Sequence, residues 1–372
     1  MLATSTHDNK RSEDVRARIN VLSEMPAAWR LALRRWSRFN RRKKKRLNGE
    51  LAPSRNDEYL LYQTLLGAWP LGALDAIELD AFRARIQRYM LKAVREAKAH
   101  TSWINPNNEY EQALSSFIDA LLGAPDKNAF LNDFLPLQAR VARYGMFNSL
   151  SQILIKFTSP GVPDIYQGNE LWDFSLVDPD NRRPVDYARR IQMLQELAAM
   201  FPADEARQAA PARCLLDSME DGRIKLYVTW KTLALRARHA ELFERGGYTP
   251  LAATGAQADH VCAFARTHGD CTLVTVAPRL FFRLTGGEDQ LPLGSAVWSA
   301  TRLLLPKTAT RYRDALTDRY FTADRSEGQC SLPLAAVLAE LPIALLMSEG
   351  SGLACGHGNA RKRAANRGGV GA

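Results

Sequence analysis

The spacing of apolar residues changes once along this chain, near Gly246, and this change restricts the folds that the chain can adopt. Before Gly246, apolar residues recur at intervals of three and four, which is typical of amphipathic helices. After it, short alternating segments such as VCAFAR and CTLVTVA lie on either side of the turn His268-Gly269-Asp270, as in a hairpin. With 372 residues, of which 46% are hydrophobic, the chain can bury a sizeable core and is expected to form two domains.

Residues that start and stop helices refine this picture. Ser12 is an N-cap candidate, because Glu13 and Asp14 follow it in the first turn, and its helix should run to about Glu24. Pro26 is then placed to start a second helix. Further helices are expected with a cap at Asn56, over 82–93, over 110–123, from about 131 and over 224–238, and an apolar strand is expected over 152–158.

The part after Gly246 is predicted to be all β. Besides the hairpin, strands are expected over 295–305, 310–317 and 341–347, which together would form a small antiparallel sandwich. Residues 351–372 are basic, rich in glycine and without periodicity, so we expect them to be disordered.

One segment, residues 161–187, concentrates side chains that carry chemistry. It holds five aspartates and two adjacent arginines, and its glycines and prolines are dense enough to predict a folded loop. Carboxylates, guanidinium groups and exposed aromatic rings are the groups that bind sugars, because hydroxyls need donors and acceptors while the C–H faces of pyranoses stack on rings. The alternative is a turn-rich surface loop that holds its own salt bridges.

The order of residues in this loop resembles a known family. GVPDIYQGNE resembles the Gly-x-Pro-x-Ile-Tyr-x-Gly-x-Glu loop that follows the eighth barrel strand of the α-amylase superfamily, and LWDFSLVDPDNRRPVDY is similar to its maltooligosyltrehalose synthase branch. THDNKRSEDVRARINVLSEMPAAW resembles that branch at the end of strand seven, and SRNDEYLLYQTLLGAWP with KAVREAKAHTSWINPN resembles the region between. The resemblance covers nearly the whole chain.

This resemblance implies an α/β fold, namely the C-terminal portion of a TIM-type (β/α)8 barrel with a large helical insertion, followed by the small antiparallel β-sandwich. The implied domains are the end of barrel strand seven with the following helix over 1–25, the helical insertion over 26–145, and barrel strand eight with the sugar loop and closing helices over 146–240. The sandwich would then occupy 241–350 and the disordered basic tail 351–372.

The resemblance also implies an enzyme, a (1→4)-α-D-glucan 1-α-D-glucosylmutase, which acts by intramolecular transglucosylation in trehalose biosynthesis. Such an enzyme converts the reducing-end α-1,4 linkage of a maltooligosaccharide into an α,α-1,1 linkage. In the family a nucleophilic Asp follows strand four, an acid/base Glu follows strand five, and a second Asp, directly after a His at the end of strand seven, binds hydroxyls of the distorted sugar.

Only this last element matches, at His7 and Asp8, with Asp8 as the implied transition-state stabiliser; Asn9 stands where the family has Thr. The nucleophile and the acid/base have no counterpart in this sequence. We therefore expect the chain alone to be inactive, with an N-terminal half as a candidate partner.

Other residues are expected to contact the maltooligosaccharide, and no metal or organic cofactor is implied. The residues are Lys10, Arg11, Asp164, Tyr166, Glu170, Trp172, Asp178, Asp180, Arg182 and Arg183. Two alternatives stay open at this point, a non-catalytic carbohydrate-binding remnant and the partner half of a split enzyme.

The net charge of +10 raises nucleic acid as a further partner. Residues 30–55 hold eleven Lys or Arg and one acidic residue, Glu50, so this window carries the whole surplus. Its run RRKKKR, 41–46, closes a helical pattern, where cations complement the helix dipole. Nucleic-acid binding is therefore the minor alternative, since interleaved aromatic residues and a known motif are lacking.

The cysteines and the apolar segments predict the compartment. The five cysteines are scattered and lack any Cys-x-x-Cys pair, which argues against a disulfide framework or a zinc site and favours a reducing compartment. The sequence does not open on a secretory signal, and LPIALLM is too short to span a bilayer. We expect a cytoplasmic protein.

Overall fold

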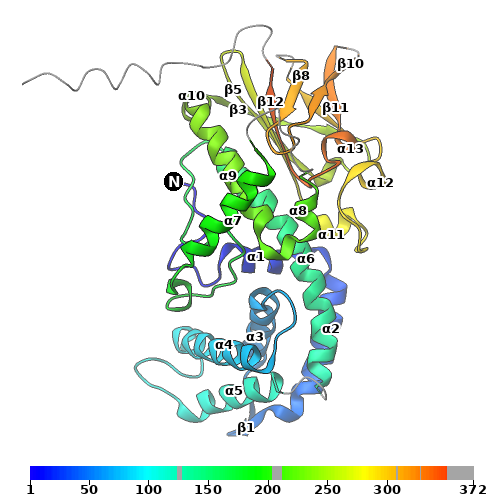
Figure 1. The fold of residues 1–372 in the computed structure, drawn as a ribbon. Helices are drawn as coiled ribbons and strands as arrows, with labels where there is room; N and C mark the ends of the chain where they lie inside the picture. The colour runs from blue at the N-terminus through cyan, green and yellow to red at the C-terminus, as the bar shows by residue number, and fades with distance from the viewer. Residues whose placement is uncertain (124–127, 203–211, 307–308, 327, 350–372) are drawn as a thin grey trace, which may run out of the picture.

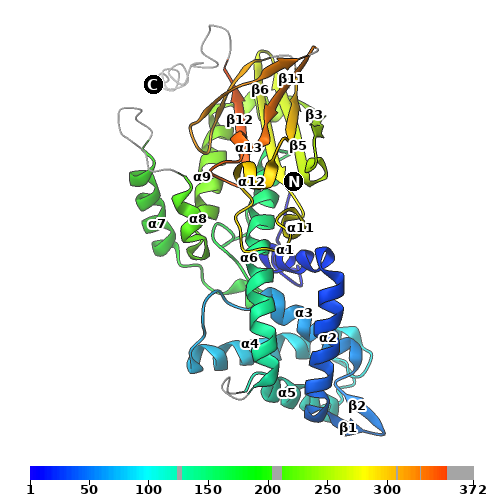
Figure 2. The same ribbon diagram turned by 90° about the vertical axis from the view of Figure 1, so that its right-hand side faces the viewer.

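The protein has mixed helix and sheet, in two parts that share one long helix. The computed structural model describes residues 1–123, 128–202, 212–306, 309–326 and 328–349. At one end lie α2 to α5, at the other lie the antiparallel sheets, and α6 passes from the first part into the second (Figure 1). The same division is visible after a quarter turn, where α6 runs along the middle of the molecule (Figure 2).

The first part consists of α1 Glu13–Val21, α2 Pro26–Asn40, α3 Arg55–Ala68, α4 Ala76–Ala97 and α5 Asn108–Leu121, with a small hairpin of β1 Lys45–Leu47 and β2 Glu50–Ala52. The expected helix starts at Ser12 and Pro26 are confirmed.

The cap predicted at Asn56 is wrong, because α3 begins two residues earlier. Its N-cap is Ser54, whose hydroxyl accepts the backbone N–H of Asp57 at 3.2 Å. The helices pack around aromatic side chains, with Trp36 at the centre, its ring within 5.2–5.6 Å of the rings of Trp29, Tyr62, Phe130 and Phe134.

Helix α6, Ala129–Thr158, spans 30 residues and belongs to both parts. It includes 152–158, so the apolar strand predicted there is wrong. The run QILIKFT is buried on most sides, and a short apolar run of this kind shows neither a helical nor a strand period. Gly145 lets α1 approach α6 closely, because a Cβ atom at this position would overlap Arg18.

The N-terminal residues pair with the segment that follows α6. The backbone N–H of Leu2 donates to the carbonyl of Val162 at 2.7 Å, and that of Asp164 donates to the carbonyl of Leu2 at 2.9 Å, which gives one parallel bridge. In residues 1–12 and 159–164, which the structure describes in full, the β pairing consists of isolated bridges and no strand forms. The barrel portion implied by the resemblance therefore stays a prediction.

The second part carries two sheets in which every pairing is antiparallel. One has the order β10-β11-β7-β4 and the other β3-β5-β6-β12-β8-β9. The strands are β3 Gly247–Leu251, β4 Ala253–Thr254, β5 Val261–His268, β6 Cys271–Pro278, β7 Arg302–Leu305, β8 Arg311–Asp314, β9 Tyr320–Thr322, β10 Asp324–Ser326, β11 Gln329–Pro333 and β12 Ala344–Ser348.

The expected hairpin forms, with His268 opposite Cys271. The strand predicted over 295–305 is wrong in its first half, because Gly294–Trp298 forms the short helix α12. The antiparallel arrangement agrees with the prediction. That the two sheets form a sandwich remains a prediction.

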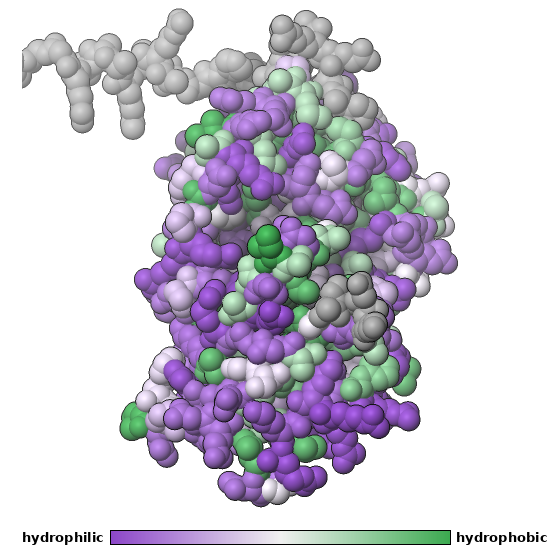
Figure 3. Space-filling model, turned by 60° about the horizontal axis from the view of Figure 1, so that its bottom comes forward, coloured by the Kyte–Doolittle hydropathy of each residue, from purple (hydrophilic) through white to green (hydrophobic). Residues whose placement is uncertain are grey.

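The remaining helices are α7 Tyr187–Met200, α8 Cys214–Asp217, α9 Arg223–Arg238, α10 Ala240–Arg245, α11 Phe281–Leu284 and α13 Leu334–Val337. Among the helices that the structure describes, none combines the length and the apolar character needed to cross a membrane. The tail predicted to be disordered, 351–372, lies outside the described residues. On the face shown in Figure 3, hydrophilic side chains predominate and hydrophobic ones form small separate areas.

Candidate functional site

The structure brings together the two segments in which sequence analysis placed the site, residues 1–12 and 161–186. The backbone N–H of Ser12 donates to the carbonyl of Ser175 at 3.0 Å, and the hydroxyl of Ser12 bonds to the carbonyl of Asp173. The side-chain amide of Asn181 donates to the carbonyl of His7 at 2.9 Å. Two loops that are far apart in the sequence thus form one surface.

His7 and Asp8 project from this surface into solvent. Nε2 of His7 lies 3.2 Å from Oδ2 of Asp8, and their side chains are 56% and 84% exposed. Because the backbone beneath is held by Asn181, both side chains are available to a ligand while their base is fixed. The structure thus gives the pair the exposure that sugar binding needs; its role remains a prediction.

Lys10 and Arg11 connect this segment to the helical part. The ammonium of Lys10 donates to Oε2 of Glu96 at 2.6 Å, and Nη2 of Arg11 donates to the hydroxyl of Thr64 at 3.1 Å. Nε of Arg11 is buried and has no hydrogen-bond acceptor within the described ranges. Lys10 remains largely exposed, so it can still reach a ligand.

The acidic and basic residues at the end of the loop are paired with one another or with α4. Nε of Arg85 lies 2.9 Å from both oxygens of Asp180, which also accepts the backbone N–H of Leu176 at 2.7 Å. Arg182 pairs with Asp178 at 3.1 Å, and Arg183 donates to the carbonyl of Asp180 at 2.9 Å. Asp180 is mostly buried, so its observed contacts match the alternative that sequence analysis left open, a loop that holds its own salt bridges.

The first half of the loop is similarly built. The hydroxyl of Tyr166 donates to the carbonyl of Asn181 at 3.3 Å, and Glu170 pairs with Arg190 of α7 at 3.1 Å. The backbone N–H of Asp164 belongs to the bridge with the N-terminal segment, and its side chain is partly exposed.

Trp172 has contacts that fix the loop from below. Its indole N–H donates to the carbonyl of Met219 at 2.7 Å, and its ring packs against the core, with the ammonium of Lys225 5.6 Å from the ring centre. The same side chain lines a cavity of about 280 Å³ together with Phe174 and Arg190. These contacts favour a structural role, and a sugar contact through the cavity stays a prediction.

Replacing Trp172 with alanine should therefore lower the free energy of unfolding by about 3 kcal/mol, the lower end of the range for a buried aromatic ring. Urea unfolding measures this, and maltopentaose affinity measured on the same samples tests the sugar contact. A variant that is as stable as the parent but binds the sugar more weakly would contradict the structural role.

A buried cluster of charges lies directly beneath the site and was not predicted from the sequence. Glu13, Asp14, Lys156 and Lys225 are at most 5% exposed. Nζ of Lys225 lies 2.8 Å from Oε1 of Glu13 and 2.8 Å from Oδ2 of Asp14, and Nζ of Lys156 lies 3.3 Å from Oε2 of Glu13. Asp14 also accepts the backbone N–H of Asp173 at 2.7 Å, so the cluster holds the loop.

The carboxylates and the ammonium groups of this cluster stabilise each other's charges. Burial alone would raise the pKa of Glu13, but the ammonium groups of Lys225 and Lys156 outweigh it and bring that pKa down to about 2. Burial also opposes the charge of Lys225, yet Asp14 and Glu13 prevail and the pKa of Lys225 lies above its usual value. Burial raises the pKa of Asp14, which lies beside Glu13. Glu13 and Lys225 therefore carry opposite charges in the interior at neutral pH.

Two sequence signals could have revealed this cluster. The helix N-terminus alone explains Glu13 and Asp14 in the sequence, yet Val15, Ala17 and Val21 show that much of α1 faces the core. Lys225 interrupts the apolar start of the helix predicted over 224–238, where a lysine without a carboxylate partner would be costly.

A third buried cation, Arg18, joins this layer to the helical part. Its guanidinium lies 3.5 Å from the ring centre of Phe174, and Nη1 donates to the carbonyl of Gly67 at 3.0 Å. Burial lowers the pKa of Arg18 to about 9. The loop 161–186, α1 and α3 thus share one base.

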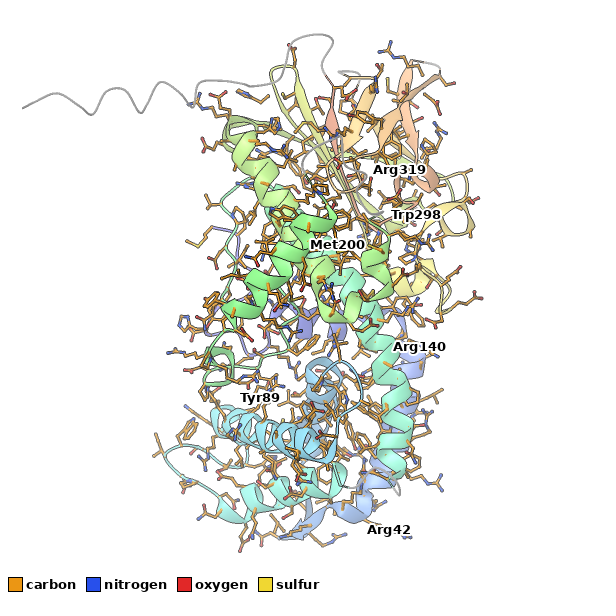
Figure 4. All side chains as sticks on the ribbon, viewed as in Figure 1. Arg42, Tyr89, Arg140, Met200, Trp298 and Arg319 are labelled. Carbon is orange, nitrogen blue, oxygen red and sulfur yellow. The ribbon has the colours of Figure 1, made fainter. Side chains whose placement is uncertain are left out.

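The basic run 41–46 lies at the far end of the helical part, as the position of Arg42 shows (Figure 4). It follows α2 as the 3-10 turn Arg41–Lys43 and enters β1. Lys44 is buried in an ion pair with Glu58 at 2.8 Å, so it is withdrawn from any nucleic-acid surface. The run therefore serves the fold in part, and nucleic-acid binding stays a minor alternative.

Comparisons with known proteins agree on one relationship. No family model matches the chain. It is 36% identical over 350 residues to a Mycobacterium tuberculosis (strain ATCC 25618 / H37Rv) protein that carries the name of a maltooligosyl trehalose synthase, which covers 94% of this chain and 38% of that protein.

Solved structures give the same result. The maltooligosyltrehalose synthase of Arthrobacter ramosus superposes with a TM-score of 0.71 at 32% identity, covering 93% of this chain and 38% of that one. A Sulfolobus tokodaii structure described as a hypothetical maltooligosyl trehalose synthase gives a TM-score of 0.62 at 29% identity, with the same coverage. The chain thus spans well under half the length of the relatives it matches.

Proposed function

Because this chain belongs to the maltooligosyltrehalose synthases, of which it spans 38%, we propose that it is part of an enzyme that isomerises the reducing-end α-1,4 linkage of a maltooligosaccharide to an α,α-1,1 linkage. The reaction is an intramolecular transglucosylation. The observation that carries the proposal is the identity of 36% over 350 residues, together with the TM-score of 0.71.

Retention at the anomeric carbon requires a carboxylate nucleophile and an acid/base that flank the scissile bond. No segment of this sequence matches the part of the family that carries either group. In this proposal, both groups belong to the part of the enzyme that the relatives have and this chain does not span. Asp8 would accept hydrogen bonds from hydroxyls of the distorted sugar, and His7 would donate beside it.

The geometry supports these roles. Asp8 is exposed, yet its segment rests on the loop through His7 and Asn181 and on the buried cluster of Glu13 and Lys225. This support fixes the backbone of the pair, so the reorganisation needed to stabilise a developing charge is confined to the exposed side chains. The released glucose must react before water does, which requires a closed site with a high effective concentration. The loop 161–186 is our candidate for the wall that holds it.

The test uses the chain alone and then a mixture. The purified chain incubated with maltopentaose should cause no loss of reducing ends. Adding the N-terminal remainder of a relative, as a separate chain, should produce a loss that neither piece gives alone. Sustained loss with this chain alone would overturn the assignment of the missing carboxylates.

A non-catalytic carbohydrate-binding remnant is the second candidate, favoured by the internal pairing of Asp178 and Asp180. It predicts maltopentaose binding without any product in the mixture, even when the two pieces associate.

A further inference from the structure

The helix α2 has two sides of opposite character. Its buried side chains, among them Trp29, Ala32 and Trp36, pack into the helical part. On the other side, exposed arginines follow one another along α2 and the 3-10 turn that ends it. This arginine face consists of Arg30, Arg34, Arg38, Arg41 and Arg42. Residues three or four apart lie on the same side of a helix, so these side chains form a row about 18 Å long.

The guanidinium groups of the arginine face have no anionic partner in the described parts of the chain. None of them lies within 4.0 Å of a carboxylate oxygen of a described residue. Other cations of the same segment are paired: Arg35 binds both oxygens of Asp133 at 3.0–3.2 Å, and Lys44 lies 2.8 Å from Glu58. The fold therefore uses these cations and leaves the arginine face to solvent.

The stability of the helix does not explain the row. Like charges three or four residues apart destabilise the helix that carries them. The helix dipole favours cations only in the last turn, which accounts for Arg38 but not for Arg30 or Arg34. A bound polyanion would remove the repulsion along the whole row, which indicates a role in binding.

The chemistry of the row restricts the anion. Guanidinium groups bind phosphate oxygens in pairs, and every member of the row is an arginine. The row lies on an outer helix, and its last member, Arg42, is at the end of the molecule opposite the sheets (Figure 4). Such a row suits an extended chain of phosphates, because one small anion would contact only one or two members. Insertion into a membrane surface needs an exposed apolar face, whereas the apolar face of α2 is buried in the core and the row includes one exposed leucine, Leu31.

We propose that the arginine face binds the phosphate backbone of a nucleic-acid duplex without reading its sequence. A row of unpaired guanidinium groups attracts the phosphates, whose counterions are released on binding. Contacts to phosphates carry no sequence information, so duplexes of different sequence should bind equally. The inference rests on Arg30, Arg34 and Arg38, and the run 41–46 adds only the end of the row. It goes beyond the proposed isomerisation and does not depend on it, since no residue assigned to the sugar site belongs to the row.

The experiment measures binding of the full chain to a fluorescent DNA duplex by anisotropy, at salt concentrations from about 50 to 200 mM. The test variant carries Arg30→Gln, Arg34→Gln and Arg38→Gln, because glutamine preserves helix propensity and removes the charge. Each lost phosphate contact lowers the steepness of log K against log salt by about 0.9, so the three changes together should lower it by about 2.7. The affinity at the lowest salt concentration should fall as well.

The matched control carries Arg238→Gln, Arg245→Gln and Arg325→Gln, which removes the same charge from exposed positions of α9, α10 and β10. Its salt dependence should equal that of the parent. All variants keep the basic segment 351–372, so the comparison between them isolates the arginine face.

A charge-preserving variant separates binding from folding. Arg30→Lys, Arg34→Lys and Arg38→Lys together should keep the salt dependence of the parent, since each lysine still contacts a phosphate. Equal salt dependence of the glutamine variant and the control, a reduced one in the lysine variant, or no duplex binding at about 50 mM salt would overturn the proposal. Retention on phosphatidylserine vesicles in place of the duplex would overturn it too, by assigning the face to a membrane surface.

Discussion

Replacing Lys225 with methionine is expected to lower the free energy of unfolding by about 3–5 kcal/mol, the usual effect of removing one partner of a buried ion pair. Methionine has a similar length, so packing changes little. Glu13 and Asp14 would then be left in the interior without the ammonium that lies 2.8 Å from each. Urea or thermal unfolding followed by circular dichroism measures the loss.

The control is Lys10→Met, which removes an ammonium from a surface pair with Glu96 and should cost about 0–1 kcal/mol. Adding Asp14→Asn to Lys225→Met should restore much of the stability, because the neutral amide needs no counter-ion and Glu13 keeps its pair with Lys156 at 3.3 Å. A loss below 1 kcal/mol for Lys225→Met would show that the cluster is hydrated and contributes little.

The second large effect concerns Asp8. In a chain that also carries the N-terminal remainder of a relative, Asp8→Asn should lower kcat about 10²–10³-fold, the range for one group that stabilises a transition state. The free energy of unfolding should stay the same, since the side chain of Asp8 is 84% exposed.

Asp270→Asn is the matched control, because Asp270 is also exposed and lies in the β5–β6 turn, away from the site. It should leave kcat unchanged. Activity of Asp8→Asn within about threefold of the parent would remove Asp8 from the proposed reaction.

The sequence predicts well those elements whose signals are local. Pro26 starts α2 by its fixed φ angle, and the two-residue turn after His268 sets the register of β5 and β6. Prediction failed over 152–158, where the decision between strand and helix depends on the 23 preceding residues of α6 and on burial from several sides. It also failed at 295–298, where a short apolar run is equally compatible with one turn of helix.

The candidate site was likewise predictable only where its signal lies in the local sequence. Its two loops could be found from residue order, because His7, Asp8 and the loop residues stand in a recognisable sequence. The charges beneath it could not, since Glu13 and Lys225 have partners that only the folded chain brings within reach. Whether an arginine or aspartate of the loop faces sugar or a neighbour is likewise a property of tertiary contacts, as Asp180 with Arg85 illustrates.

The dependence of the N-terminal segment on distant partners has a consequence for synthesis on the ribosome. The carboxylate of Asp14 bonds to the ammonium of Lys225, which follows it by 211 residues. At a translation rate of about 5–20 residues per second, Lys225 is therefore added roughly 10–40 s after Asp14. In that interval its carboxylate is hydrated and needs no partner. The surface that carries Asp8 is thus completed only after the helical part and α9 have emerged. A stall before Lys225 would leave the loop 161–186 without the buried cluster that supports it.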